Sequence, residues 1–160
     1  SRVPIGDPRM RALFREVAAR GKPVVNHVMA LGGFDPPTET QQVNDIVELA
    51  AALPELTVVA YHGGGFDWEC MIELAEPLPN LYVEYASSWP QDNPVRAAVD
   101  RLGPKRVMFG TDMDLLSPSL MVGLVDSAGL DDTVYAAVLH QNARRVFGLG
   151  PPPAGGVGHS

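Results

Sequence analysis

The chain has 160 residues, of which 46% are hydrophobic and 19% charged, a composition typical of one globular domain with a buried core. Its net charge of -7 disfavours binding to nucleic acid or to an anionic membrane surface, since both would repel it. No apolar run approaches the ~20 residues of a membrane span, and the single cysteine, Cys70, excludes an internal disulfide. We therefore expect a cytoplasmic globular protein with no nucleic acid or membrane partner.

Short β-rich runs alternate with longer helical patterns along the chain. The expected strands cover residues 23–27, 56–62, 80–87 and 106–112. The expected helices cover residues 8–20, 37–53, 68–78 and 94–103, a segment that begins at 118, and 132–149. Because the strands are nearly all apolar and alternate with helices, we expect an α/β fold with a parallel sheet covered by helices. The tail 150–160 has no periodicity and is expected to be disordered, which leaves 1–149 as one domain.

Polar side chains stand where the expected strands end. His27, His62 and Asp112 end three of them, and Ser87 or Ser88 ends the other. The carboxyl ends of parallel strands meet at one edge, so these side chains can converge on one point. Imidazoles and a carboxylate are ligands for zinc and are also suited to proton transfer near neutral pH. Taken singly, each His could be structural and the Asp could be a turn former or helix cap.

A run of three glycines follows His62 directly. Gly63, Gly64 and Gly65 carry no Cβ, so the backbone can turn sharply and a substrate can approach it closely. We therefore predict that Gly63 and Gly64 contact a substrate, with a merely flexible loop as the alternative. Asp67 is expected to cap the helix that comes next.

Four segments together resemble a known family: "HGGG" after a strand, "PNLYVEYAS", "LGPKRVMFGTDM" and "VLHQNARRVFGL". They are similar to the amidohydrolase-related metal-dependent hydrolases, in the branch with amino-carboxymuconate-semialdehyde decarboxylase-like and resorcylate decarboxylase-like enzymes. The resemblance spans residues 7 to 149 and implies a distorted (β/α)8 TIM barrel. A complete barrel has ~250 residues, so the resemblance implies only the C-terminal half, strands five to eight.

The resemblance also implies site residues and a cofactor. His27 resembles the metal-ligand His of strand five, and His62 resembles the strand-six His that contacts substrate and transfers a proton. Asp112 matches the strand-eight Asp, a metal ligand or proton acceptor, and Asn142 with Ala143 resembles the structural signature of the last helix. The implied cofactor is a divalent metal, zinc first, with Mn or Mg as alternatives. The His-x-His pair of strand one is absent, and so is the Tyr-Pro pair after the strand-eight Asp.

Other polar residues have plainer interpretations. Glu84 lies within an expected strand and points either into a barrel lumen or to a partly exposed edge. His140 lies in the last expected helix and is expected at the surface or between helices. Cys70 is expected to pack in the core.

Two functions from different classes remain open. The first is a metal-dependent hydrolase or nonoxidative decarboxylase of a small carboxylate- or carbonyl-containing substrate. His62 would be the general acid or base there, His27 would help hold the metal, and Asp112 would bind the metal or accept the proton of its water. We expect this chain alone to be inactive and to form a homo-oligomer or to pair with a missing N-terminal half-barrel. The second is a noncatalytic half-barrel that serves as a binding or assembly module.

Overall fold

The computed structural model describes residues 5, 7–28, 39–86, 94–113 and 115–151. Its strands are β1 Val24–His27, β2 Val58–Tyr61, β3 Leu81–Tyr85 and β4 Val107–Phe109. Its α-helices are α1 Arg11–Ala19, α2 Glu39–Ala52, α3 Trp68–Ala75, α4 Pro94–Leu102, α5 Pro118–Ser127, α6 Asp132–Ala136 and α7 Asn142–Phe147. Shorter helical turns are η1 Pro8–Met10, η2 His62–Asp67, η3 Pro104–Arg106 and the π-helical η4 Ala137–Gln141. The predicted alternation of strands and helices is confirmed within these ranges.

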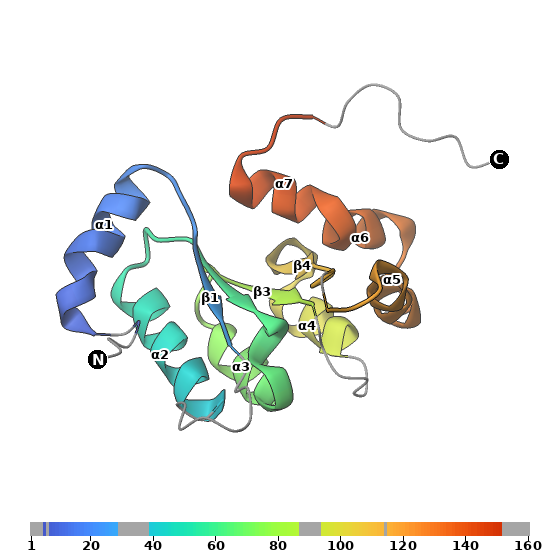
Figure 1. Ribbon diagram of the computed structural model, residues 1–160, viewed down its shortest axis with the longest axis horizontal. Helices are drawn as coiled ribbons and strands as arrows, with labels where there is room; N and C mark the ends of the chain where they lie inside the picture. The colour runs from blue at the N-terminus through green and yellow to red at the C-terminus, as the bar shows by residue number, and fades with distance from the viewer. Residues whose placement is uncertain (1–4, 6, 29–38, 87–93, 114, 152–160) are drawn as a thin grey trace.

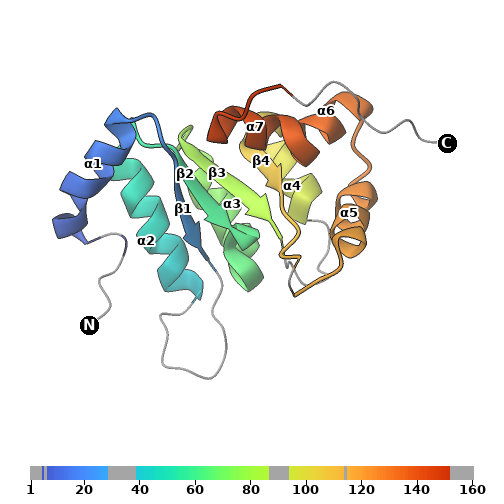
Figure 2. The same ribbon diagram turned by 45° about the horizontal axis from the view of Figure 1, so that its top comes forward.

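The strands form one parallel sheet in the order β1-β2-β3-β4 (Figure 1). Helices α2, α3 and α4 cover one face of this sheet (Figure 2). The strand and helix residues that meet there are fully buried and apolar: Val58, Ala60, Leu81, Val83 and Val107 from the strands, and Ile46, Met71 and Ile72 from the helices. In the described part of the chain, no helix is long and apolar enough to cross a membrane.

Helix α7 packs near β3 and β4 and is tied to them by polar contacts. The side-chain amide of Asn142 donates hydrogen bonds to the carbonyl oxygens of Pro104, at 2.6 Å, and Val107, at 2.8 Å. The Arg145 guanidinium lies 5.8 Å from the centre of the Tyr82 ring. Asn142 therefore has the structural role that the sequence predicts for it.

Two aspartates cap helical segments through hydrogen bonds of their side chains. The Asp7 carboxylate accepts the Arg9 backbone N–H at 2.8 Å, and the Asp131 carboxylate accepts that of Val134 at 3.0 Å. Asp67 stands at the N-cap position of α3, but its side chain makes no capping hydrogen bond. The capping role predicted for Asp67 is therefore wrong.

The structure corrects several expected element boundaries. Strand β2 ends before His62, whose left-handed backbone angles cannot continue a strand. Strand β4 ends at Phe109, three residues before Asp112, which also has a positive φ. The last expected helix is interrupted by the π-turn η4, which adds a residue to the turn and changes which side chains face the sheet. Ser87, Ser88 and the tail 152–160 lie outside the described residues.

We predict that Asn142→Ala lowers the free energy of unfolding by about 1–3 kcal/mol, because it leaves the Pro104 and Val107 carbonyls without these donors. Urea denaturation measures this change. The control is Gln141→Ala at the exposed neighbouring position, where we expect a change below about 0.5 kcal/mol. Equal effects of the two substitutions would contradict the structural role of Asn142.

Candidate active site

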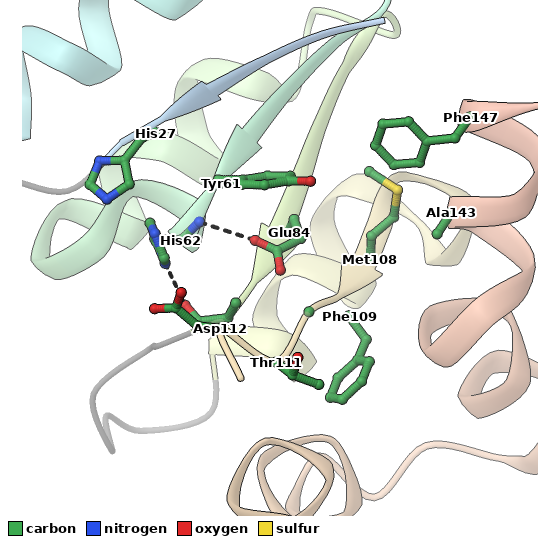
Figure 3. A pocket seen from close by; sticks show the side chains of 12 residues that line it. His27, Tyr61, His62, Glu84, Met108, Phe109, Thr111, Asp112, Ala143 and Phe147 are labelled. Atoms are coloured by element: carbon green, nitrogen blue, oxygen red, sulfur yellow. Dashed lines mark hydrogen bonds between the residues drawn. The ribbon is translucent and has the colours of Figure 1, made fainter. Parts of the chain in front are cut away.

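One row of residues runs across the sheet at its carboxyl end. His27 is in register with Tyr61, Tyr61 with Glu84, and Glu84 with Met108. Side chains that are paired across neighbouring strands project from the same face, so this row forms the floor of a single pocket (Figure 3). The pocket has a volume of about 330 Å³, which suits a small molecule.

The other walls come from the segment after β4 and from α7. Thr111 and Asp112 contribute from the loop after β4, and Ala143 and Phe147 contribute from α7. The three strand-end residues predicted from the sequence, His27, His62 and Asp112, all line this pocket. The predicted convergence of these three side chains is thus present in the structure, whereas their chemical roles stay predictions.

His62 is the most constrained of the three residues. It is 6% exposed and has a φ of 65°, in the left-handed region that non-glycine residues rarely adopt. Its ring nitrogen Nδ1 lies 2.6 Å from the Ala86 carbonyl oxygen. A carbonyl oxygen only accepts hydrogen bonds, so Nδ1 carries the proton and Nε2 is the basic nitrogen. Such a group can accept a proton from a ligand or return one to it.

His27 lies next to His62, with the two rings edge to face and their centres 4.6 Å apart. Partial burial and the neighbouring His62 lower the pKa of His27, and the Asp112 carboxylate opposes this shift. The neutral imidazole that these effects favour is the form that binds metals.

Asp112 also has a positive φ, 49°, so two non-glycine residues of one pocket, His62 and Asp112, have unusual backbone angles. Such clustering is typical of functional sites.

Glu84 belongs to the same pocket, although it was not predicted as a site residue from the sequence. It is 6% exposed on a strand between β2 and β4 and lines the pocket, so the expected alternative of a partly exposed edge position is wrong. Burial raises the pKa of Glu84 to about 7, helped by the Asp112 carboxylate and opposed by the backbone N–H groups of His62 and Ala86. The available signal was a lone carboxylate inside an apolar strand, a group that is rarely buried without a partner or a function.

The glycine run is a sharp turn whose first residues are buried. Gly63, Gly64 and Gly65 all have positive φ, as the sequence interpretation requires. A Cβ on Gly63 would overlap the Tyr85 ring, and one on Gly64 would lie 2.6 Å from Met71 Cβ. These glycines therefore allow close packing of the turn on β3 and α3. Neither Gly63 nor Gly64 lines the pocket described above, so their contact with a substrate stays a prediction.

The donors present fit a metal only in part. His27 and Asp112 are suitable ligand types, but a catalytic zinc ordinarily has three protein ligands. Among the described residues, no three His, Cys, Asp or Glu side chains are grouped so that they could hold a metal ion. This part of the chain does not by itself complete a metal site.

Two of the remaining predictions concern residues away from the pocket. Cys70 packs against the hydrophobic core, as expected, and burial raises the pKa of its thiol. His140 is exposed on η4, in agreement with a surface position.

A sequence model of the amidohydrolase family matches residues 2–149. Among solved structures, an uncharacterised TIM-barrel protein from Bordetella bronchiseptica is 24% identical, with a TM-score of 0.76 over 92% of this chain and 53% of its own. A 5-carboxyvanillate decarboxylase from Sphingomonas paucimobilis is 17% identical, with a TM-score of 0.71 over 92% of this chain and 56% of its own. An amidohydrolase from Burkholderia multivorans with bound zinc is 18% identical, with a TM-score of 0.69 over 91% of this chain and 59% of its own.

These likenesses identify the fold as an α/β fold of TIM-barrel type. The chain spans little more than half the length of the solved structures named here. No curated protein sequence matches the chain.

We predict that raising the pH from 5 to 8 lowers the free energy of unfolding of the wild-type protein relative to that of Glu84→Gln. In the folded protein Glu84 keeps its proton up to a pKa of about 7, whereas the unfolded chain loses it near the ordinary value of 4.5. The folded state therefore binds more protons in this range, and raising the pH destabilises it by on the order of 3 kcal/mol in total. Urea denaturation of both proteins at the two pH values measures the difference. An equal change in the free energy of unfolding of the two proteins between these pH values would contradict the raised pKa of Glu84.

Proposed function

Because the chain belongs to the amidohydrolase family, we propose that it is the C-terminal half of a cytoplasmic TIM-barrel enzyme with a metal-dependent hydrolase or nonoxidative decarboxylase activity. The proposed substrate is a small molecule that carries a carboxylate or carbonyl group. Within the family we assign the chain to the branch that contains amino-carboxymuconate-semialdehyde decarboxylase-like and resorcylate decarboxylase-like enzymes. The observation that carries the proposal is the convergence of His27, His62, Glu84 and Asp112 in one pocket.

The proton-transfer part of this function rests on three side chains. His62 presents a basic Nε2 because its Nδ1–H is held by Ala86. Glu84, with a pKa of about 7, can hold or release a proton at physiological pH, the property required of a general acid or base. Asp112 adds a carboxylate to the same pocket. These groups can protonate a substrate carbon before loss of CO₂, or accept a proton from an attacking water in a hydrolysis.

The pocket walls favour a flat, partly apolar substrate. Tyr61, Met108, Phe109 and Phe147 surround the polar groups with aromatic and apolar surface. A 5-carboxyvanillate decarboxylase is among the similar structures, and its substrate is an aromatic acid. This likeness supports an aromatic or unsaturated acid as the first class of substrate to test.

The metal in this proposal needs ligands beyond those described. A similar amidohydrolase contains zinc, and His27 and Asp112 supply two suitable donors. A third donor would have to come from residues outside the described ranges or from a separate half-barrel. Measuring the metal content of the purified protein tests this point, and the DNA upstream of the sequence should encode a strand with a His-x-His pair.

A noncatalytic binding or assembly module is the second candidate. The observation that favours it is the incomplete set of metal donors among the described residues. A purified protein without metal and without turnover of aromatic acids would support the module over the enzyme, whereas near-stoichiometric zinc or manganese would support the enzyme.

We predict that His62→Asn lowers turnover by about 10² to 10⁴ in an active form of the enzyme that contains this chain, because a general acid–base group is removed. Fold and metal content should stay nearly unchanged, since His27 and Asp112 are retained. Steady-state kinetics, circular dichroism and metal analysis of the same preparations measure these effects. Wild-type turnover in His62→Asn would eliminate His62 as the proton-transfer group.

We predict that the 160-residue chain self-associates through its sheet edges. In the described residues β1 pairs with β2 alone and β4 with β3 alone, so each has one edge without a partner strand, although on β4 the Asn142 amide already binds the Val107 carbonyl. Val25 on β1 is 37% exposed, and Val25→Lys should shift sedimentation toward monomer because an edge lysine opposes pairing.

Leu120→Lys is the control for this experiment, at a position that is 61% exposed on helix α5 and therefore outside the strands of the sheet. This variant should sediment like the wild type.

Added zinc should bind weakly, because His27 and Asp112 are only two ligands. A wild-type monomer that binds zinc tightly would contradict the half-barrel proposal.

A further inference from the structure

Glu84 and Ala86 hold His62 from the neighbouring strand at two points. The Glu84 carboxylate accepts the backbone N–H of His62 at 3.3 Å through Oε2, in a buried contact. The Ala86 carbonyl accepts the imidazole Nδ1–H. One contact acts on the backbone of His62 and the other on its ring, so together they restrict both the φ of this residue and the orientation of its side chain (Figure 3).

Gly110 provides the space in which the Glu84 carboxylate lies. A Cβ on Gly110 would overlap Glu84 Oε1 and would lie 3.0 Å from Ala86 Cβ. Gly110 does not have a positive φ, so its backbone angles do not explain why a glycine stands there. The close approach of the Glu84 carboxylate explains it, because a side chain at this position would collide with that carboxylate. Gly110, Glu84 and Ala86 thus form one packed unit beside His62.

The left-handed backbone of His62 needs such support. A non-glycine residue with φ of 65° is strained by roughly 1–2 kcal/mol per residue, and strain of this kind persists only where the surroundings hold it. Without the carboxylate, the N–H of a residue that is 6% exposed would lose a charged acceptor, and the turn could relax toward ordinary angles. Relaxation of the turn would move the imidazole away from the Ala86 carbonyl.

We propose that Glu84, seated against Gly110, is the positioning residue that fixes His62 as the Nδ1–H tautomer with Nε2 available in the pocket. The inference rests on the proposed function only in treating His62 as the proton-transfer group. It assigns to Gly110, and to Glu84 in addition to the proton transfer proposed above, a role that acts through His62.

The test is the tautomer of His62 in the full chain, read from nitrogen NMR of protein labelled with ¹⁵N-histidine. His62→Asn assigns the His62 signals. At about pH 8, where imidazoles in proteins are ordinarily neutral, the wild type should show His62 predominantly as the Nδ1–H form. A wild-type His62 that carries its proton on Nε2 would overturn the proposal directly, without any variant.

Three variants then separate positioning from space filling. Gly110→Ala displaces the carboxylate and Glu84→Ala removes it, so each should lower the ratio of Nδ1–H to Nε2–H forms by about tenfold, the effect of leaving one buried N–H without its acceptor. Glu84→Gln keeps an acceptor oxygen and should retain the wild-type ratio. The matched control is Gly123→Ala, whose added Cβ would meet nothing within 4 Å and should leave the ratio unchanged.

Circular dichroism identifies the variants that stay folded. A wild-type ratio in folded Gly110→Ala or Glu84→Ala would show that Glu84 only fills space and would overturn the proposal. Because this readout needs no turnover, its failure is distinct from failure of the proposed function, which His62→Asn tests by kinetics. In an active form of the enzyme, Gly110→Ala should lower kcat and leave KM little changed.

Discussion

The arrangement of the site depends on the register of the parallel sheet. Because His27, Tyr61, Glu84 and Met108 are in register across four strands, their side chains leave the sheet on one face and at one level. A shift of any strand by one residue would send its side chain to the helix-covered face, since side chains alternate along a strand. The packing of α2, α3 and α4 on the opposite face therefore holds the pocket together, although none of these helices contributes a residue to it.

Much of this arrangement is predictable from the sequence because strongly apolar strands between amphipathic helices have few alternatives to a parallel α/β sheet. The positions of His27, His62 and Asp112 at strand ends were sufficient to predict that they converge, since the carboxyl ends of parallel strands share an edge. The family resemblance predicted the TIM-barrel type in addition. The roles of these residues in metal binding and proton transfer are not accessible to the same reasoning, because they depend on which further ligands complete the site.

The details that the sequence did not predict depend on contacts between distant segments. In a strand that is apolar on both faces, alternation does not show which face a single polar residue occupies, so the orientation of Glu84 stayed open. The left-handed angles of His62 are held by contacts with Glu84 and Ala86, and neither these angles nor those of Asp112 have a local sequence signal. Gly110 belongs to a familiar motif, yet its purpose becomes visible only when the carboxylate of another strand is seen in the space it leaves.

The described residues supply more of the groups needed for the proposed proton transfer than of those needed for the proposed metal site. The proton-transfer part is nearly complete, because His62 has a defined tautomer and Glu84 has a pKa close to physiological pH. The metal part has only His27 and Asp112 among the described residues. A complementary half-barrel would therefore have to contribute metal ligands and a second wall to the pocket, and it would not need to bring a general acid or base. On the proposed function, this division means that the described half sets the protonation chemistry, while the other half decides whether a metal is bound at all.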